Sequence, residues 1–363
     1  MRRLLLAVVS IAVSAVSPPA GLGQGADRAS IELERILAHG PWPPPFVTDP
    51  SNRVSGQPAA IGLGRRLFFD ARLSPSGKVA CSSCHRPERA WTDGRALGVG
   101  LQMGHLNTPS LYNVSGLTWL GWGGAGDSLW AQSVRPLLDP REMGASASHV
   151  QSYLGSHPEL GAAYAAAFGR GPQVVDPQTA LVDAAKALAA YQETFLSPRT
   201  AFDAYRDALA AGDAAGMAAY PAAARRGLSM FIDKGGCATC HDGSTFGGNA
   251  FADIRRRASP RTSRARGVVD VLASPYSLSS RYNDAPKERR PQGAYVLMTA
   301  AAEERALRVP PLRNVARTAP WLHDGTATTL SAAIRAHRHA RNLRADEIGD
   351  LVRFLETLSD PKP

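Results

Sequence analysis

All four cysteines of the chain lie in two short strings that could hold an iron cofactor. The strings are Cys81-Ser82-Ser83-Cys84-His85 and Cys237-Ala238-Thr239-Cys240-His241. At this spacing two thiols can add to the two vinyl groups of haem, and the histidine that follows can bind the iron as its proximal ligand. Two disulfides would leave the histidines unexplained, and zinc needs four ligands where each string offers three. The sequence therefore predicts two covalently attached c-type haems.

The elements that must position these strings are mainly helical. Ala- and Leu-rich segments show helical periodicity, and alternating strand patterns are almost absent. The expected helices are 32–37, 148–168, 177–195, 202–219, 221–232, 330–340 and 345–358. Glycine-rich turns at 121–126 and 243–248 are expected to be loops that pack against cofactor. The pattern predicts a mostly α protein with two cytochrome-c-like helical domains, each carrying one c-type haem.

The N-terminus has the layout of a secretory signal peptide, with Met1-Arg2-Arg3, an apolar stretch to Val16 and a Pro- and Gly-containing end near Gln24. The apolar stretch is shorter than the ~20 residues of a membrane-spanning helix. We therefore expect a signal peptide at 1–23, export to the periplasm and no membrane insertion after cleavage. Because the remainder exceeds the usual size of one core, we expect two haem domains, at 24–200 and 201–363.

The net charge of +10 does not indicate a nucleic-acid partner, because the excess lies mainly in one segment. That segment runs from Arg255 to Arg290 and is rich in Ser, Pro and Arg. We expect it to be a long solvated loop or insertion, and a docking surface for an acidic partner is the alternative.

Several further strings resemble the bacterial dihaem cytochrome c peroxidase and MauG superfamily in order and spacing, from about Ile61 to Leu358. They are Leu67-Phe68-Phe69-Asp70 with Leu73-Ser74, Trp91-Thr92-Asp93-Gly94-Arg95, Asn107-Thr108-Pro109-Ser110-Leu111, Glu142-Met143-Gly144, residues 231–246, Val309-Pro310-Pro311-Leu312-Arg313-Asn314-Val315 and Pro320-Trp321-Leu322-His323-Asp324-Gly325. The resemblance implies a haem oxidoreductase that reacts with hydrogen peroxide in its first domain and transfers electrons in its second.

The resemblance also implies the roles of individual residues around the first haem. Glu142 falls on the family's acid/base position, where a carboxylate moves a proton between the oxygens of bound peroxide. Gln132 falls on the amide that borders the same pocket, and Pro136 lies in the connection between the two. Trp122 falls on the family's inter-haem tryptophan, although Gly123-Gly124-Ala125 replace the usual Asp-Gly-Arg and leave its local hydrogen bonding open.

A calcium ion between the domains is a further implication of the resemblance. The family holds it through an asparagine side chain, two backbone carbonyls and water, and Asn107, Thr318 and Pro320 fall on those positions. Oxygen ligands with several waters suit calcium.

Two departures from the peroxidases indicate the subtype. Where peroxidases place a histidine that blocks the first haem, alignment puts Val99, which predicts an open first haem; His105 is a rival ligand nearby. Counting from His323 to the position where peroxidases carry methionine and MauG carries tyrosine gives His337. We expect His241 and His337 to ligate the second iron together, with His339 as the alternative to His337.

These departures favour a MauG-like enzyme that uses hydrogen peroxide to oxidise Trp or Tyr residues of an exported partner protein. An ordinary cytochrome c peroxidase, which takes electrons from a small cytochrome or cupredoxin, is the alternative. A non-catalytic electron-transfer cytochrome would not need Glu142 and Gln132. Nothing in the sequence speaks for a peroxide-sensing protein.

Overall fold

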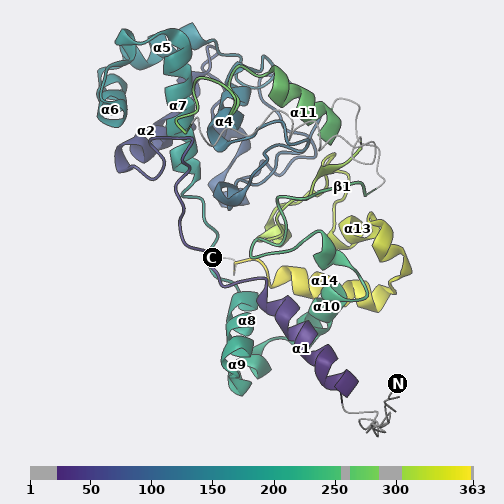
Figure 1. Ribbon diagram of the computed structural model, residues 1–363. Helices are drawn as coiled ribbons and strands as arrows, with labels where there is room; N and C mark the ends of the chain where they lie inside the picture. Colours follow the sequence, from purple (N-terminus) through teal and green to yellow (C-terminus); the bar gives the residue numbers. More distant parts are fainter. Residues whose placement is uncertain (1–22, 255–261, 286–304, 361–363) are drawn as a thin grey trace, which may run out of the picture.

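The computed structural model describes residues 23–254, 262–285 and 305–360, which form two helical lobes (Figure 1). The predicted signal peptide lies almost wholly outside these residues, as do two parts of the basic segment. Within the described residues no helix is both long and apolar enough to span a bilayer.

The upper lobe of Figure 1 contains the first haem string and the lower lobe contains the second. The upper helices are α2 (Pro58–Phe69), α3 (Cys81–Cys84), α4 (Leu129–Leu138), α5 (Ala147–Ser156), α6 (Pro158–Phe168), α7 (Pro177–Gln192) and α11 (Arg264–Ala273). The lower helices are α1 (Gly23–Leu37), α8 (Ala201–Ala211), α9 (Ala214–Ala219), α10 (Ala222–Ile232), α13 (Leu330–Arg335) and α14 (Ala345–Glu356). Strands β1 (Phe251–Ala252) and β2 (Leu307–Arg308) pair antiparallel. They form the one small sheet of the described residues.

Each lobe is built around two helices that cross at a glycine. A methyl group on Gly64 of α2 would lie 2.0 Å from the carbonyl oxygen of Ala187 on α7. A methyl group on Gly227 of α10 would lie equally close, at 2.0 Å, to the carbonyl oxygen of Asp350 on α14. In both pairs the haem string follows the first helix, so the two lobes repeat one construction. The prediction of a mostly helical protein with two cytochrome-c-like units is confirmed.

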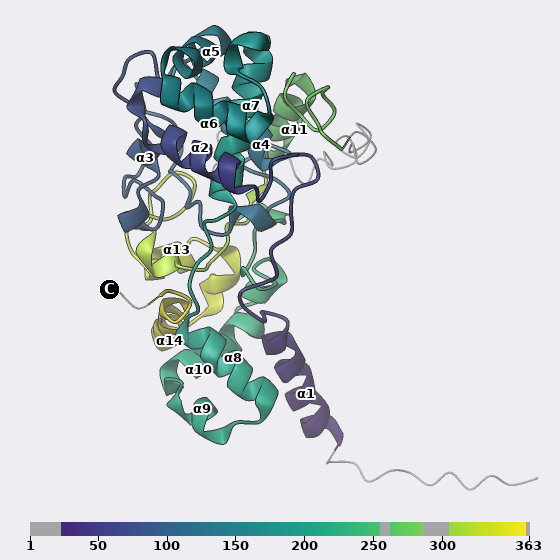
Figure 2. The same cartoon turned by 90° about the vertical axis from the view of Figure 1, so that its left-hand side faces the viewer.

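The two lobes exchange segments of chain. The end of α1 and the residues that follow it pack on the lower lobe, where Ile36 is part of the core and the ring centre of His39 lies 4.3 Å from that of Phe246. Figure 2 shows α1 projecting beside α8, far from the upper helices. In the other direction, residues 263–285 pack on the upper lobe, where Lys186 Nζ lies 2.6 Å from Asp284. The division at residue 200 stays a prediction, and these two segments cross it.

Some predicted helices differ from those observed. The helix expected at 148–168 is two helices, α5 and α6, because Pro158 lacks the N–H that a continuous helix would need. Helices α2 and α4 were not predicted, and α4 contains Pro136. The basic segment from Arg255 to Arg290 was expected to be a loop, and this is wrong for the part that forms α11. The side chain of Ser263 caps this helix, and the helix buries Val268 and Val271 against Trp119.

Candidate active site

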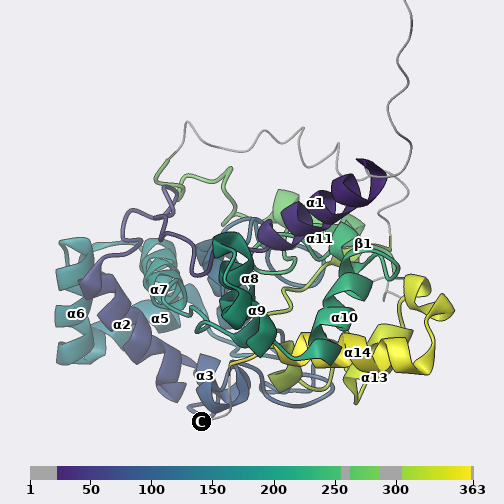
Figure 3. The same ribbon diagram turned by 90° about the horizontal axis from the view of Figure 1, so that it is seen from below.

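Two cavities lie at the two haem strings, one in each lobe. The first has a volume of about 1230 Å³ and is lined by Cys81, Cys84 and His85. The second has a volume of about 480 Å³ and is lined by Cys237, Cys240, His241, His323 and His337. Seen from below in Figure 3, α10 and α14 lie side by side in the lobe that holds the second cavity. Each cavity therefore has a complete haem-attachment string in its wall.

The proximal histidines are oriented by backbone carbonyls. His85 Nδ1 is 3.0 Å from the oxygen of Trp91, and His241 Nδ1 is 3.2 Å from the oxygen of Phe246. A carbonyl can only accept, so each Nδ1 carries the proton and each Nε2 keeps a lone pair for iron. Burial lowers the pKa of His85, and burial together with His337 lowers the pKa of His241 to about 4. Both rings are therefore neutral at pH 7, as iron ligands must be.

The structure places His337 opposite His241 across the second cavity. Their ring centres are 6.4 Å apart. A metal–nitrogen distance of about 2.0 Å would place the centres of two imidazoles on one iron roughly 6.3 Å apart. His337 Nδ1 is 2.9 Å from the oxygen of Ala333, which leaves its Nε2 free as well. His339 lies on the 3₁₀ turn Arg338–Asn342, and it also lines the second cavity, but its side chain is exposed. The helix predicted at 330–340 is shorter in the structure. It ends at Arg335, and His337 lies two residues beyond that end.

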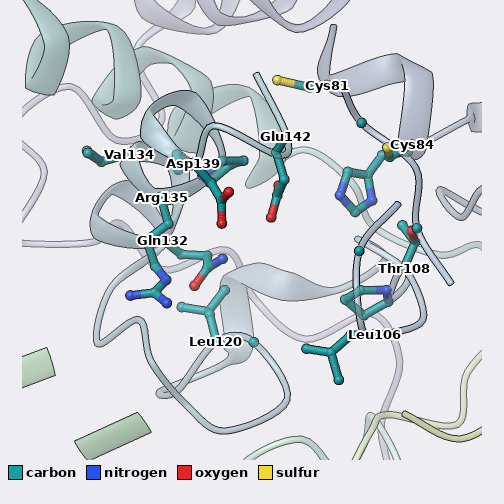
Figure 4. Close-up of a pocket in the computed structure, with 18 of the residues that line it drawn as sticks. Cys81, Cys84, Leu106, Thr108, Leu120, Gln132, Val134, Arg135, Asp139 and Glu142 are labelled. Atoms are coloured by element: carbon teal, nitrogen blue, oxygen red, sulfur yellow. The ribbon is translucent and has the colours of Figure 1, made fainter. Parts of the chain in front are cut away.

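The predicted acid/base group and amide meet at the first cavity. Ser128 caps α4 by accepting from the N–H of Ala131, and this helix presents Gln132 to the cavity. After α4 the chain turns back, with the N–H of Met143 donating to the carbonyl of Pro136 at 3.2 Å. Figure 4 shows Gln132 and Glu142 reaching into the same open space beside Cys84. The buried Oε1 of Gln132 has no hydrogen-bond partner in the described part of the chain, so it can accept from a ligand.

A second carboxylate, Asp139, lies beside Glu142 (Figure 4). Glu142 is exposed to the open cavity, yet desolvation by the surrounding protein raises its pKa, and the charge of Asp139 acts in the same direction, against weaker effects of Arg135 and Arg141. Hydrogen bonds from Arg141, including one of 3.0 Å from Nη2, lower the pKa of Asp139. One carboxyl is thus suited to exchange a proton while its neighbour stays ionised. Sequence reasoning missed Asp139, although it stands three positions before Glu142.

Trp122 lies in the wall between the two cavities and lines both. Its indole N–H donates to the carbonyl of Asn107 at 2.9 Å, and the ring centre of His323 is 6.3 Å from its own. Asn107 in turn donates its backbone N–H to the carbonyl of His323 at 2.8 Å. Trp122 and Asn107 also line the second cavity with Thr318 and Pro320. Asn107, one of the residues expected at the calcium site, is therefore a direct neighbour of the tryptophan expected between the haems.

The loop after Trp122 is braced by an arginine that sequence reasoning missed. Arg264 of α11 is fully buried, and its guanidinium carbon lies 4.1 Å from the ring centre of Trp119. Its Nη1 donates to the carbonyl of Gly124 at 3.3 Å. A cation from α11 thus stands against the loop that lacks the family's usual Asp and Arg. No local signal could have found it, because the two residues are 140 positions apart.

The residues present fit a haem in each cavity. Each cavity offers two thiols and a neutral, oriented histidine, and the second cavity also has His337 at the spacing of a second iron ligand. When bound, a haem iron supplies the centre at which peroxide is bound and reduced, or through which an electron passes.

Comparisons with known proteins agree with this fit. Residues 58–210 match the family described as di-haem cytochrome c peroxidase. The chain is 31% identical over 316 residues to the methylamine utilization protein MauG of Methylorubrum extorquens, covering 83% of this chain and 78% of that protein. It is 29% identical to the cytochrome c551 peroxidase of Pseudomonas aeruginosa, covering 99% and 93% of the two chains.

Two solved structures are similar along most of their length. One is a MauG-like protein associated with microbial copper homeostasis, with a TM-score of 0.63, 26% identity and coverage of 88% of this chain and 96% of that one. The other is the dihaem peroxidase BthA of Burkholderia thailandensis, with a TM-score of 0.63, 25% identity and coverage of 88% of both chains. On these grounds the chain belongs to the di-haem cytochrome c peroxidase and MauG family, and it is a haem oxidoreductase with two c-type haems.

Proposed function

We propose that this protein is a MauG-like enzyme, which uses hydrogen peroxide to oxidise Trp or Tyr residues of an exported partner protein. The observation that carries the proposal is the placement of His337 opposite His241, at 6.4 Å between ring centres. Two imidazole ligands lack the thioether that raises the reduction potential in Met/His cytochromes. Such a second haem is a poor acceptor of electrons from a small cytochrome and suits the storage of an oxidising equivalent.

The surroundings of the first cavity support an open first haem. Val99, which aligns with the blocking histidine of the peroxidases, lies beside the first haem string, with its carbonyl 3.3 Å from Cys84 Sγ. An aliphatic side chain cannot ligate iron. His105, the rival ligand, also lines this cavity and is exposed in the described structure. Peroxide could then react without prior reduction of the protein.

We assign the reaction to four residues. Glu142 takes the proton from one oxygen of peroxide and returns it to the other oxygen, which leaves as water when the O–O bond breaks, and the Gln132 amide holds the ligand beside it. Pro136 sets the turn that faces Glu142 toward the cavity. Trp122 passes electrons across the wall between the two cavities.

Electron paramagnetic resonance of the diferric protein, before and after one equivalent of hydrogen peroxide, tests the proposal. We expect one high-spin signal and one low-spin bis-histidine signal, both lost on addition of peroxide without a reductant. Two low-spin signals that resist peroxide until one haem is reduced would contradict it. That result would instead favour a cytochrome c peroxidase that receives electrons from a small cytochrome or cupredoxin. The similarity to the Pseudomonas aeruginosa enzyme supports this alternative.

A matched pair of variants tests the second iron ligand. His337→Ala should convert the second haem from low spin to high spin, because no second imidazole then reaches the iron. His339→Ala, two positions away on an exposed turn, should leave the spectrum unchanged. The reverse pattern would assign the ligand to His339.

We also propose a calcium ion held by Asn107, Thr318 and Pro320, and export of the protein to the periplasm. The three residues line one cavity, and the side-chain amide of Asn107 is held by its N–H to the carbonyl of Arg95 at 2.8 Å. Removal of calcium with a chelator should disturb the absorption spectrum and peroxide reactivity, and added calcium should restore both. Fractionation of cells that express the full chain tests the location.

A further inference from the structure

Arg308 is a buried cation in the wall between the two cavities. It belongs to β2, is 5% exposed and lines both cavities. Its side chain donates from Nε to the carbonyl of Gly121 at 3.2 Å and from Nη1 to the carbonyl of Gly248 at 3.4 Å. Gly121 borders the first cavity, and Gly248 follows the second haem string. Its own backbone N–H donates to the carbonyl of Trp122 at 2.8 Å.

Arg308 forms no ion pair within the described part of the chain. Burial alone lowers its pKa, to about 10, and no acidic group among the described residues raises it. A guanidinium has five N–H donors, and the two carbonyls use only two of them. Burial of a charge without a counter-ion costs free energy. An anion that accepts hydrogen bonds from the remaining donors would therefore stabilise Arg308.

Arg313, five positions further along the chain, is a buried arginine whose charge is neutralised by a carboxylate. Its guanidinium is fully buried and makes a two-pronged ion pair with Asp203, at 2.7 and 2.9 Å. Arg308 is as deeply placed but faces two cavities instead of a carboxylate. Within the described residues, the space that its free donors face is that of the two cavities.

We propose that Arg308 is a shared anion-binding residue, which binds a propionate carboxylate of each haem and so joins the two cofactors beside Trp122. Haem carries its propionates as carboxylates, the anions that a planar guanidinium binds in two-pronged fashion. Three free donors suffice for one two-pronged bond and one single bond. The proposal rests on the presence of two haems and not on which partner the enzyme oxidises.

The inference has a consequence for the two irons. A cation near both haems stabilises their reduced, less positive states. Because Arg308 also holds the loops at Gly121 and Gly248, it keeps Trp122 aligned with the two cofactors. Arg308 is thus a positioning residue that also sets the reduction potentials.

Arg308→Met tests the proposal, since methionine retains much of the length of the side chain without its charge. Both haems stay attached through their thioethers, which a pyridine haemochrome assay checks. Spectroelectrochemical titration should show both midpoint potentials falling, and resonance Raman spectra should show changed propionate bending modes for both haems. Arg308→Lys keeps the charge but not the planar fork, so its potentials should stay near those of the unaltered protein while the propionate modes change.

The exposed Arg353 on α14, substituted by Met, is the matched control and should change neither readout. Changes confined to one haem would overturn the shared site, and unchanged propionate modes in both variants would overturn the anion site altogether. If the Met variant does not assemble, the Lys variant decides alone: propionate modes like those of the unaltered protein would contradict the proposal.

Discussion

At the scale of single residues, the first cavity places two carboxyl groups side by side and treats them differently. Glu142 projects into the cavity, where desolvation favours its neutral form, whereas Asp139 is kept ionised by Arg141. A group whose pKa is moved toward the working pH can both take and return a proton. The pair therefore matches what proton transfer between two peroxide oxygens requires.

Glu142→Gln should slow the reaction with peroxide by about 10²- to 10⁴-fold, the usual contribution of a positioned acid/base group. Stopped-flow absorption of the diferric protein mixed with peroxide measures the rate. Glu88→Gln, an exposed glutamate shortly after the first haem string, is the control and should react normally. An unchanged rate in the Glu142 variant would remove this residue from the mechanism.

Asp139→Asn should shift the pH dependence of the same reaction toward lower pH. The negative charge of Asp139 raises the pKa of Glu142, so its removal lowers that pKa, and the freed Arg141 acts in the same direction. The ionised form of Glu142, which accepts the proton, then persists to lower pH. The rate measured across pH should keep its plateau while its acidic limb moves down, and a limb that moves up would contradict the coupling.

At the scale of elements, the helix pairs α2–α7 and α10–α14 hold the haem strings in place. Both crossings depend on a glycine that lets two backbones touch, at Gly64 and Gly227. Glu142 follows α4, which packs on α7, His241 follows α10, and His337 follows α13, which packs on α14. The rigidity of the helix pairs therefore determines how accurately Glu142, His241 and His337 face their cavities.

Gly227→Ala should destabilise the lower lobe by about 1–3 kcal/mol, because the added methyl group overlaps the backbone of α14. Gly349→Ala, on α14 but with nothing near its Cβ, should instead stabilise it by roughly 0.5–1 kcal/mol through helix propensity. Denaturant unfolding followed by circular dichroism measures both changes. Equal stabilities in the two variants would show that the crossing tolerates a side chain.

At the scale of the whole molecule, the two lobes are tied together by the segments they exchange. Trp42 shows this, because its ring lies 3.7 Å from the guanidinium carbon of Arg313 and its N–H donates to the carbonyl of Ser197 at 2.9 Å. It thus covers the buried Arg313–Asp203 pair of the lower lobe. The N-terminal segment and the chain that links the lobes meet at this one side chain.

Trp42→Ala should therefore destabilise the protein by about 3–5 kcal/mol, the usual cost of removing a buried aromatic ring. In thermal unfolding, the low-spin spectrum of the second haem should be lost before that of the first haem changes. Phe46→Ala, at a side chain that is 58% exposed, is the control and should change stability by no more than about 0.5 kcal/mol. Simultaneous loss of both spectra would indicate that the lobes unfold as one unit.

The sequence by itself determined the chemistry that adjacent residues perform. Thioether attachment and proximal ligation need only the five positions of each haem string, and the helical periodicity around them sufficed for the fold class. It also pointed to Glu142, Gln132 and Trp122, through strings that resemble a known family. The sequence did not predict α11, because the basic, Ser- and Pro-rich composition of its segment favours a loop. The apolar residues that pack on Trp119 are too few to change that prediction.

Only the tertiary structure decided which distant residues meet. It favoured His337 over His339 as the residue that faces His241, and it placed Arg264 and Arg308 against the loops around Trp122. Local patterns cannot specify such contacts, because each depends on how two elements far apart in the chain pack together. Buried charge is the clearest case, since the partner that makes it tolerable lies across the fold or, for Arg308, in the cofactors we expect beside it.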